Sequence, residues 1–189
     1  MENKEHTVGS HCDTQEFIDS ATLTTQSAES LENEAMVVEL ARCIARVAHS
    51  GQVDKSGVDY IEHPAAVAKE FEMNGEGKRA AAAWLHDVVE DSSITIEGLL
   101  AIGVPLEVVE IVDLLTRKDD VPDDEYYRRI AANPDALAVK LADIRHNTRL
   151  DRQTLLEEHA KIRLTKKYIH AAEMLGQNDF ANELRGRLP

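Results

Sequence analysis

The chain has 189 residues, of which 43% are hydrophobic and only 4% aromatic, and its formal net charge is −14 at pH 7. This length allows one domain with a sizeable core, and the acidity argues against a nucleic-acid polymer as partner. No apolar run is long enough to cross a membrane, and residues 1–6 lack the pattern of a signal peptide, so we expect no membrane association. The two cysteines, Cys12 and Cys43, form no recognisable framework, which favours a reducing cytoplasm.

The first part of the chain differs in composition from the rest. Residues 1–32 are rich in Ser, Thr, Glu and Gln and show little apolar periodicity, so we expect a flexible acidic tail. Residues 33–189 show apolar positions at helical spacing, interrupted by Gly and Pro, and we expect them to form one domain.

Helical periodicity recurs along this domain. The first predicted helix runs from Glu34 to just before Gly51, and Asn74-Gly75 ends the second. Its inward stripe is expected to comprise Val37, Leu40, Ala41, Ile44, Val47 and Ala48. The later expected helices span about 63–73, 78–89, 95–101, 105–115, 126–132, 137–150, 155–175 and 179–188. No sustained alternation of period two is present, so the sequence predicts an all-α fold in one compact bundle.

An acidic cluster follows the run of alanines at 80–83. At 3.6 residues per turn, His86 and Glu90 are neighbours on one helix face, and so are Asp87 and Asp91. Three carboxylates held together repel one another unless a cation lies among them. A solvated helix end is the ordinary interpretation of an acidic run, but this one directly follows an apolar segment. We therefore interpret it as a metal site.

Two further side chains could supply metal ligands from apolar surroundings. His63 stands immediately before Pro64, at the start of a predicted helix. Asp143 follows Leu141-Ala142 in a helix predicted to be buried, where an isolated carboxylate is costly unless it is paired or metal-bound. Taken singly, His63 could be a helix-end histidine and Asp143 a salt-bridge partner.

Taken together, these segments resemble the HD-domain superfamily of metal phosphohydrolases. Within it the chain is most similar to the hydrolase domain of the RelA/SpoT alarmone enzymes and their small stand-alone relatives. The resemblance covers roughly residues 35–175. The matching blocks are AHSGQ (48–52), KSG (55–57), YIEHP (60–64), LHDVVED (85–91), VKLAD (139–143) and HN (146–147).

The resemblance implies a fold, an ion and a reaction. The fold would be an HD-type helical bundle, and the reaction would be hydrolysis of the 3′-pyrophosphate of guanosine alarmones (ppGpp or pppGpp). One divalent ion is expected, usually Mn²⁺ in this branch, and two nitrogen and two carboxylate donors also suit Fe or Zn. The expected metal ligands are His63, His86, Asp87 and Asp143.

We hypothesise roles for other residues around this ion. Glu90 and Asp91 would orient and deprotonate the attacking water. The expected substrate contacts are Lys55, Asn147, Arg149 and Arg152.

Two departures from the family pattern leave the substrate open. The common Asp-Arg-x-His-Asn motif here reads Asp143-Ile144-Arg145-His146-Asn147, which moves the arginine about 100° around the helix, and the second departure is Asp54. The alarmone hydrolases usually carry an arginine, thought to pack on guanine, where this chain has Asp54. An aspartate cannot stack in that way and is expected to repel phosphates. The alternatives are therefore a phosphohydrolase for another nucleotide or phosphorylated metabolite, and, ranked last, a non-catalytic nucleotide sensor. The sequence does not determine the oligomeric state.

Overall fold

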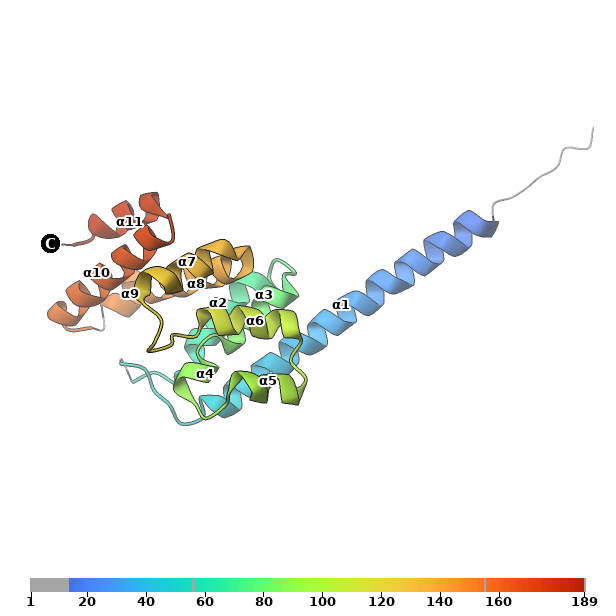
Figure 1. Cartoon of the computed structure of the whole chain (residues 1–189), viewed down its shortest axis with the longest axis horizontal. Coiled ribbons are helices and arrows are strands. Elements are labelled where there is room, and N and C mark those ends of the chain that lie inside the picture. Colours follow the sequence, from blue (N-terminus) through green and yellow to red (C-terminus); the bar gives the residue numbers. More distant parts are fainter. Residues whose placement is uncertain (1–13, 56, 155, 189) are drawn as a thin grey trace, which may run out of the picture. The chain divides into compact units, whose positions relative to one another are not determined.

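The computed structural model describes residues 14–55, 57–154 and 156–188, with side chains from Ser30 onward (Figure 1). The predicted all-α fold is confirmed, since the described residues contain helices and no strand beyond an isolated β-bridge between Val53 and Asp59. The helices are α1 Thr14–Ala48, α2 Glu62–Glu72, α3 Gly77–Leu85, α4 Val88–Asp91, α5 Ile96–Ile102, α6 Leu106–Leu115, α7 Asp123–Ala132, α8 Pro134–Asn147, α9 Leu150–Gln153, α10 Glu158–Met174 and α11 Asn178–Arg185.

The chain divides into two units after Glu34, close to the predicted boundary between residues 32 and 33. Residues 1–13 of the expected tail lie outside the described residues, and residues 14–32 form the beginning of α1. The flexibility of the tail therefore stays a prediction. The second unit contains the rest of the chain and all the residues discussed below.

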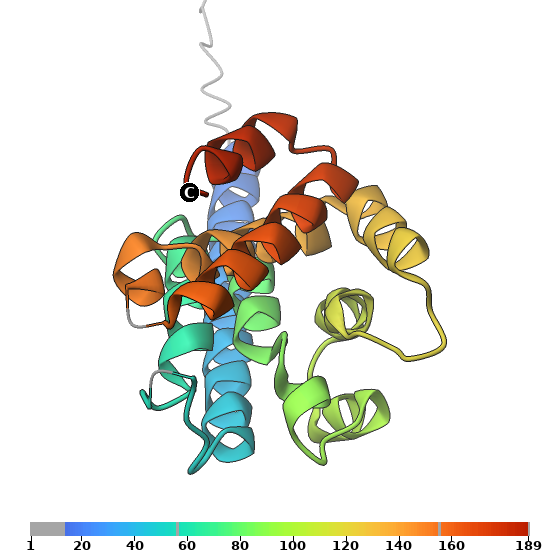
Figure 2. The ribbon, with the colours of Figure 1, turned by 90° about the vertical axis from the view of Figure 1, so that its left-hand side faces the viewer.

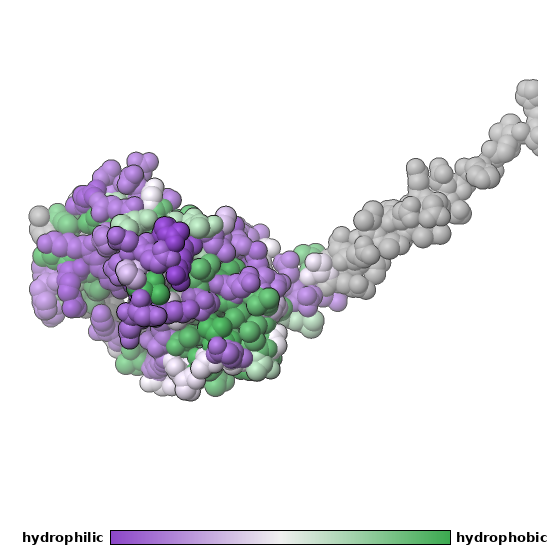
Figure 3. Space-filling model, viewed as in Figure 1, coloured by the Kyte–Doolittle hydropathy of each residue, from purple (hydrophilic) through white to green (hydrophobic). Residues whose placement is uncertain are grey.

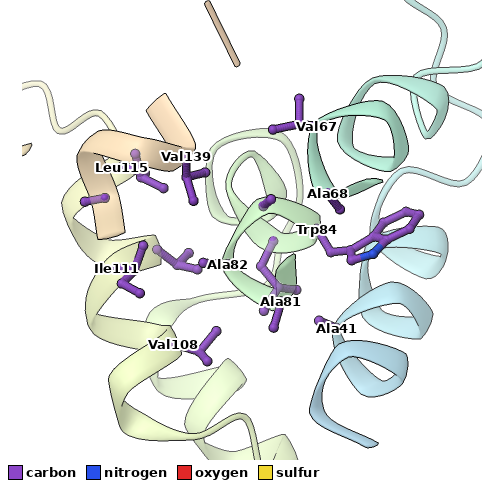
Figure 4. Packing of buried hydrophobic residues seen from close by; sticks show 14 of the residues in the cluster. Ala41, Val67, Ala68, Ala81, Ala82, Trp84, Val108, Ile111, Leu115 and Val139 are labelled. Carbon is purple, nitrogen blue, oxygen red and sulfur yellow. The ribbon is translucent and has the colours of Figure 1, made fainter. Parts of the chain in front are cut away.

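Helix α3 lies at the centre of the second unit and packs against α2, α6 and α8. Its residues 80–85 are all buried, and the four alanines are completely so. Figure 4 shows Ala81 and Ala82 facing apolar side chains of the surrounding helices, among them Val108 and Ile111 of α6. Because alanine side chains are short, the neighbouring helices can approach α3 closely and fill the space with larger residues.

Helix α8 begins earlier than the sequence predicted. The side chain of Asn133 accepts hydrogen bonds from the backbone N–H groups of Asp135 and Ala136, both at 3.0 Å, and Pro134 occupies the first turn. An Asn cap followed by Pro satisfies or removes the free N–H groups of a helix start. The predicted start at 137 was therefore wrong, as was the predicted end at 150, because the chain leaves the helix after Asn147.

The predicted helix over 78–89 is also interrupted. α3 ends at Leu85, the chain turns at His86-Asp87, and α4 begins at Val88. The His86 Nδ1 atom lies 2.7 Å from the Ala83 carbonyl oxygen, so the side chain bonds to a backbone acceptor near the end of α3. The continuous helix predicted over this stretch is therefore divided at His86-Asp87, although the Asp91 N–H still donates to the Asp87 carbonyl at 2.9 Å, as the predicted i,i+4 spacing requires.

One inward position predicted for the first helix was also wrong. Val47 is 75% exposed, whereas Val38 and Ala45, which the predicted stripe omitted, are buried.

At the other end of the second unit, α10 and α11 lie side by side (Figure 2). They share a small apolar cluster that includes Ile169 and Leu184. Figure 3 shows apolar residues gathered over α5 and α6, where Leu100, Ile102 and Leu106 are exposed. In the part of the chain that the structure describes, no helix combines the length and the apolar character needed to span a membrane.

Candidate metal centre and active-site cavity

Three donor groups from two segments meet at one point. The Nε2 atoms of His63 and His86 lie 3.2 Å apart, and Asp87 Oδ2 lies 3.5 Å from the first and 3.1 Å from the second. Both histidines are buried and Asp87 is partly buried. His63 is placed by the first turn of α2, and His86-Asp87 by the turn between α3 and α4. These three residues form a group that could hold a metal ion.

Asp143 of α8 approaches the same point from a third segment. Its Oδ1 atom lies 3.3 Å from His63 Nε2 and 3.9 Å from His86 Nε2, and the residue is only 6% exposed. The structure thus brings together all four of the residues expected to bind metal.

The hydrogen bond of the outer ring nitrogen of His86 indicates which of its nitrogens is free to face the centre. His86 Nδ1 faces the Ala83 carbonyl, an acceptor, so a neutral His86 carries its proton there and directs the Nε2 lone pair inward. The donor set of two imidazole nitrogens and two carboxylates fits Mn, Fe or Zn, whereas Mg generally takes oxygen ligands. The residues present therefore fit a divalent transition-metal ion.

The electrostatics of the centre favour positive charge. Burial alone would lower the pKa of His86, but the neighbouring carboxylates of Asp87 and Asp143 raise it to about 9. The pKa of Asp143 is held below its usual range, because Lys140 and the two histidines outweigh the effect of burial. A cation is thus favoured between these carboxylates, which is the role a bound metal ion would fill.

Several partners hold the carboxylates, and the sequence analysis missed most of them. The Tyr60 hydroxyl donates to Asp87 Oδ2 at 2.7 Å, and Lys140 Nζ lies 3.0 Å from Asp143 Oδ2. Asn147, expected to contact substrate, donates to Asp143 Oδ1 at 2.5 Å. Tyr60 lies within the YIEHP block and Lys140 within the VKLAD block, so the blocks themselves were the only available signal.

A cavity of about 520 Å³ opens beside this centre. His63, Asp87 and Asp143 line it together with Glu90 and Asp91, the expected catalytic carboxylates. Its cationic lining residues, among the described residues, are Lys55, Arg117, Lys140, Arg152 and Lys167. A mixture of acids near the metal centre and cations around it suits a small phosphorylated ligand.

Glu90 occupies a defined place in this cavity. Its Oε1 atom accepts a hydrogen bond from the Arg117 backbone N–H at 2.5 Å. The pKa of Glu90 is raised above its usual value, mainly by lost solvation, although the Arg117 N–H acts in the opposite direction. The Arg117 guanidinium packs over the ring of Tyr126 at 4.1 Å from its centroid.

The four expected substrate contacts divide into two groups. Lys55, Asn147 and Arg152 line the cavity, whereas Arg149 is not among its lining residues. The Arg149 side chain is 58% exposed and lies 2.7 Å from Asp151.

Known proteins resemble this chain in sequence and in fold. No protein-family model matches the chain. The chain is 35% identical over 159 residues to the guanosine-3′,5′-bis(diphosphate) 3′-pyrophosphohydrolase of Haemophilus influenzae, covering 75% of this chain and 23% of that protein. It is 44% identical over 77 residues to the protein of the same name from Vibrio cholerae, covering 40% of this chain and 11% of that protein. It is also 35% identical over 130 residues to the bifunctional (p)ppGpp synthase/hydrolase SpoT of Escherichia coli K12, covering 62% of this chain and 18% of that protein. The chain thus spans less than a quarter of the length of these relatives.

A solved structure shares the fold. It is described as a metazoan ortholog of SpoT that hydrolyzes ppGpp, and it superposes with a TM-score of 0.60 at 21% identity, covering 79% of this chain and 96% of that one. The predicted resemblance to RelA/SpoT-type hydrolases and the predicted HD-type fold are therefore confirmed.

Proposed function

We propose that this chain is a metal-dependent phosphohydrolase that removes pyrophosphate from the 3′ position of guanosine alarmones, converting ppGpp or pppGpp to GDP or GTP. The observation that carries the proposal is the convergence of two imidazoles and two carboxylates from three segments beside a cavity lined with cations. The similarity to proteins named as 3′-pyrophosphohydrolases supports the choice of substrate.

The proposed centre holds one divalent ion, which we expect to be Mn²⁺, with Fe or Zn as alternatives. Its ligands would be His63, His86, Asp87 and Asp143. When bound, the ion would polarise a phosphoryl oxygen and lower the pKa of a nearby water. The chain supplies the fixed geometry, since Tyr60 holds the Asp87 carboxylate and Lys140 holds that of Asp143.

Glu90 is the proposed general base, and Asp91 helps to orient the attacking water. The water oxygen bonds to phosphorus as its proton passes to Glu90, and the bond from phosphorus to the 3′ oxygen breaks. The 3′ oxygen then takes up a proton, which completes the hydrolysis. The raised pKa of Glu90 brings this carboxylate closer to the working pH, and that improves a general base.

Cations around the cavity would receive the phosphates. Lys55 and Arg152 are the proposed contacts, together with Arg117 and Lys167, which the sequence analysis did not single out. The phosphate contact predicted for Arg149 stays a prediction.

A phosphohydrolase for another nucleotide or phosphorylated metabolite is the second candidate. It is favoured by Asp54, which lines the cavity where alarmone hydrolases usually have an arginine. In this case the metal centre and the general base would be the same, and only the substrate would differ.

A nucleotide panel tests the proposal. The purified protein would be analysed for bound metal, supplied with Mn²⁺, and incubated with ppGpp, pppGpp, GDP, GTP and ATP. We expect pyrophosphate release from the alarmones, and none from an Asp143→Ala variant, which lacks one proposed ligand. Release of phosphate from other nucleotides, with the alarmones left intact, would favour the second candidate. A protein that binds no metal and hydrolyses none of these compounds would refute both.

A further inference from the structure

Asp54, one of the two departures from the family pattern, makes an ion pair across the cavity wall. Its Oδ2 atom lies 3.0 Å from Arg152 Nη2, although the two residues are 98 positions apart in the chain. Both side chains line the cavity. The Asp54 side chain is 10% exposed and that of Arg152 is 27% exposed, so water only partly screens the pair.

The backbone around Asp54 is fixed independently of this pair. Asp54 Oδ1 accepts a hydrogen bond from the Val58 backbone N–H at 3.1 Å, and the Asp54 N–H donates to the Val58 carbonyl at 2.8 Å. These bonds join Asp54 to Val58, so the carboxylate is presented from a defined position. Arg152 lies on the short helix α9, next to Gln153, whose buried side chain donates to Thr165 of α10 at 3.4 Å.

One edge of the Arg152 guanidinium is held in this way, and the other edge remains available. A guanidinium carries five N–H donors in one plane, and of these only Nη2 bonds to a described side chain. Its remaining donors can bind phosphate oxygens, which arginine contacts in planar, paired geometry. An anchored arginine also loses less side-chain entropy on binding a ligand than a free one does.

From this geometry we propose that Asp54 is a positioning residue that anchors Arg152 as an anion-recognition group for the phosphates of the substrate. The inference deepens the proposed function and rests on the cavity being its substrate site. It reverses the expectation from sequence, in which Asp54 repels phosphates. The carboxylate charge is matched by the guanidinium, so an approaching phosphate meets a paired, oriented cation.

The two interpretations predict opposite signs for one substitution. Asp54→Asn removes the charge but keeps an oxygen that can accept the Val58 N–H, so this hydrogen bond is preserved. If Asp54 anchors Arg152, the loss of charge releases the arginine, and binding of inorganic pyrophosphate weakens about three- to tenfold. If Asp54 repels phosphates, the same substitution strengthens binding.

The Arg152→Ala background provides the second half of the test. There the Asp54 charge no longer faces the Arg152 guanidinium, so adding Asp54→Asn should now strengthen pyrophosphate binding. Asp54→Asn would thus weaken pyrophosphate binding when Arg152 is present and strengthen it when position 152 is alanine. No such coupling is expected if Asp54 acts independently of Arg152. Asp151→Asn is the matched control, because Asp151 pairs with Arg149 and neither lines the cavity.

Calorimetric titration of the full chain with pyrophosphate, in the presence of Mn²⁺, measures the pyrophosphate affinity of each variant directly. KM and kcat for ppGpp are measured in parallel, and we expect the change to fall on KM. Stronger or unchanged binding in Asp54→Asn, or weakening in both backgrounds, would overturn the inference. Should Asp54→Asn fail to fold, Asp54→Ser is measured in its place. Because pyrophosphate binding requires no turnover, a protein inactive on alarmones would refute the proposed function while still testing this pair.

Discussion

The hydrogen bond from Tyr60 to Asp87 offers a direct test of the metal centre. Tyr60→Phe removes only the hydroxyl, which donates to Asp87 Oδ2 at 2.7 Å, and keeps the ring that packs 4.9 Å from that of His49. Burial, followed by the charge of Asp87, raises the pKa of Tyr60 well above its usual value, so the hydroxyl is a donor at every practical pH.

The size of the effect follows from the charge of the acceptor. A hydrogen bond to a charged group contributes roughly 1.5–3 kcal/mol, and each 1.4 kcal/mol corresponds to about a tenfold change in an equilibrium constant. If Asp87 is held for the metal by this bond, Tyr60→Phe should weaken Mn²⁺ binding by about 10- to 100-fold. This agrees with the usual consequence of removing the partner of a metal ligand.

The assay is calorimetric titration of the chelator-treated protein with Mn²⁺ at constant pH. Tyr168→Phe is the matched control, because Tyr168 lines the same cavity without a hydroxyl hydrogen bond to any described residue. Its Mn²⁺ affinity should equal that of the unmodified protein. A Tyr60→Phe protein that is folded and binds Mn²⁺ as tightly as the control would refute the reasoning.

Three other perturbations have defined outcomes. Glu90→Gln should retain its metal and lose about 10²–10⁴-fold in the rate of ppGpp hydrolysis, measured in single turnovers; full activity would contradict its role as base. The pKa of Asp135 is lowered by Lys78 and Arg79, which outweigh partial burial, so its charge stabilises the fold at pH values above its unfolded pKa of about 3.9. Asp135→Asn should therefore lower the free energy of unfolding by up to about 1 kcal/mol at pH 7, and urea titrations should show the difference vanishing as the pH falls through the lowered, folded-state pKa. Ala82→Leu should cost about 1–3 kcal/mol of stability by overpacking α3, and a thermal midpoint equal to that of the unmodified protein would show that the core has room.

Local sequence patterns were sufficient to predict helix starts and ends where residues adjacent along the chain determine them. The start of α2 at Glu62 and its end at Glu72 follow from Pro64 and from Asn74-Gly75, and the start of α5 follows from the Thr95 side chain, which accepts from the Gly98 N–H. Asn133 carried a comparable signal for α8 that the prediction did not use.

The break between α3 and α4 could not be read from periodicity. Every residue from Lys78 to Asp91 tolerates a helix. The chain turns where the His86 and Asp87 side chains meet His63 of α2 and His86 also approaches Asp143 of α8. Contacts with other helices outweigh a weak local preference at such a position.

The amino-acid sequence by itself determined the helical class, most helix positions, and the identities of the four side chains now found together, because these depend on local spacing and on blocks of residue types. Only the tertiary structure decided that Asp143 lies 3.3 Å from His63, that Tyr60 supports Asp87, and that Arg152 pairs with Asp54. Each of these contacts joins residues 27 or more positions apart. Their geometry depends on how the buried faces of several helices pack together, and no short stretch of the chain encodes that packing.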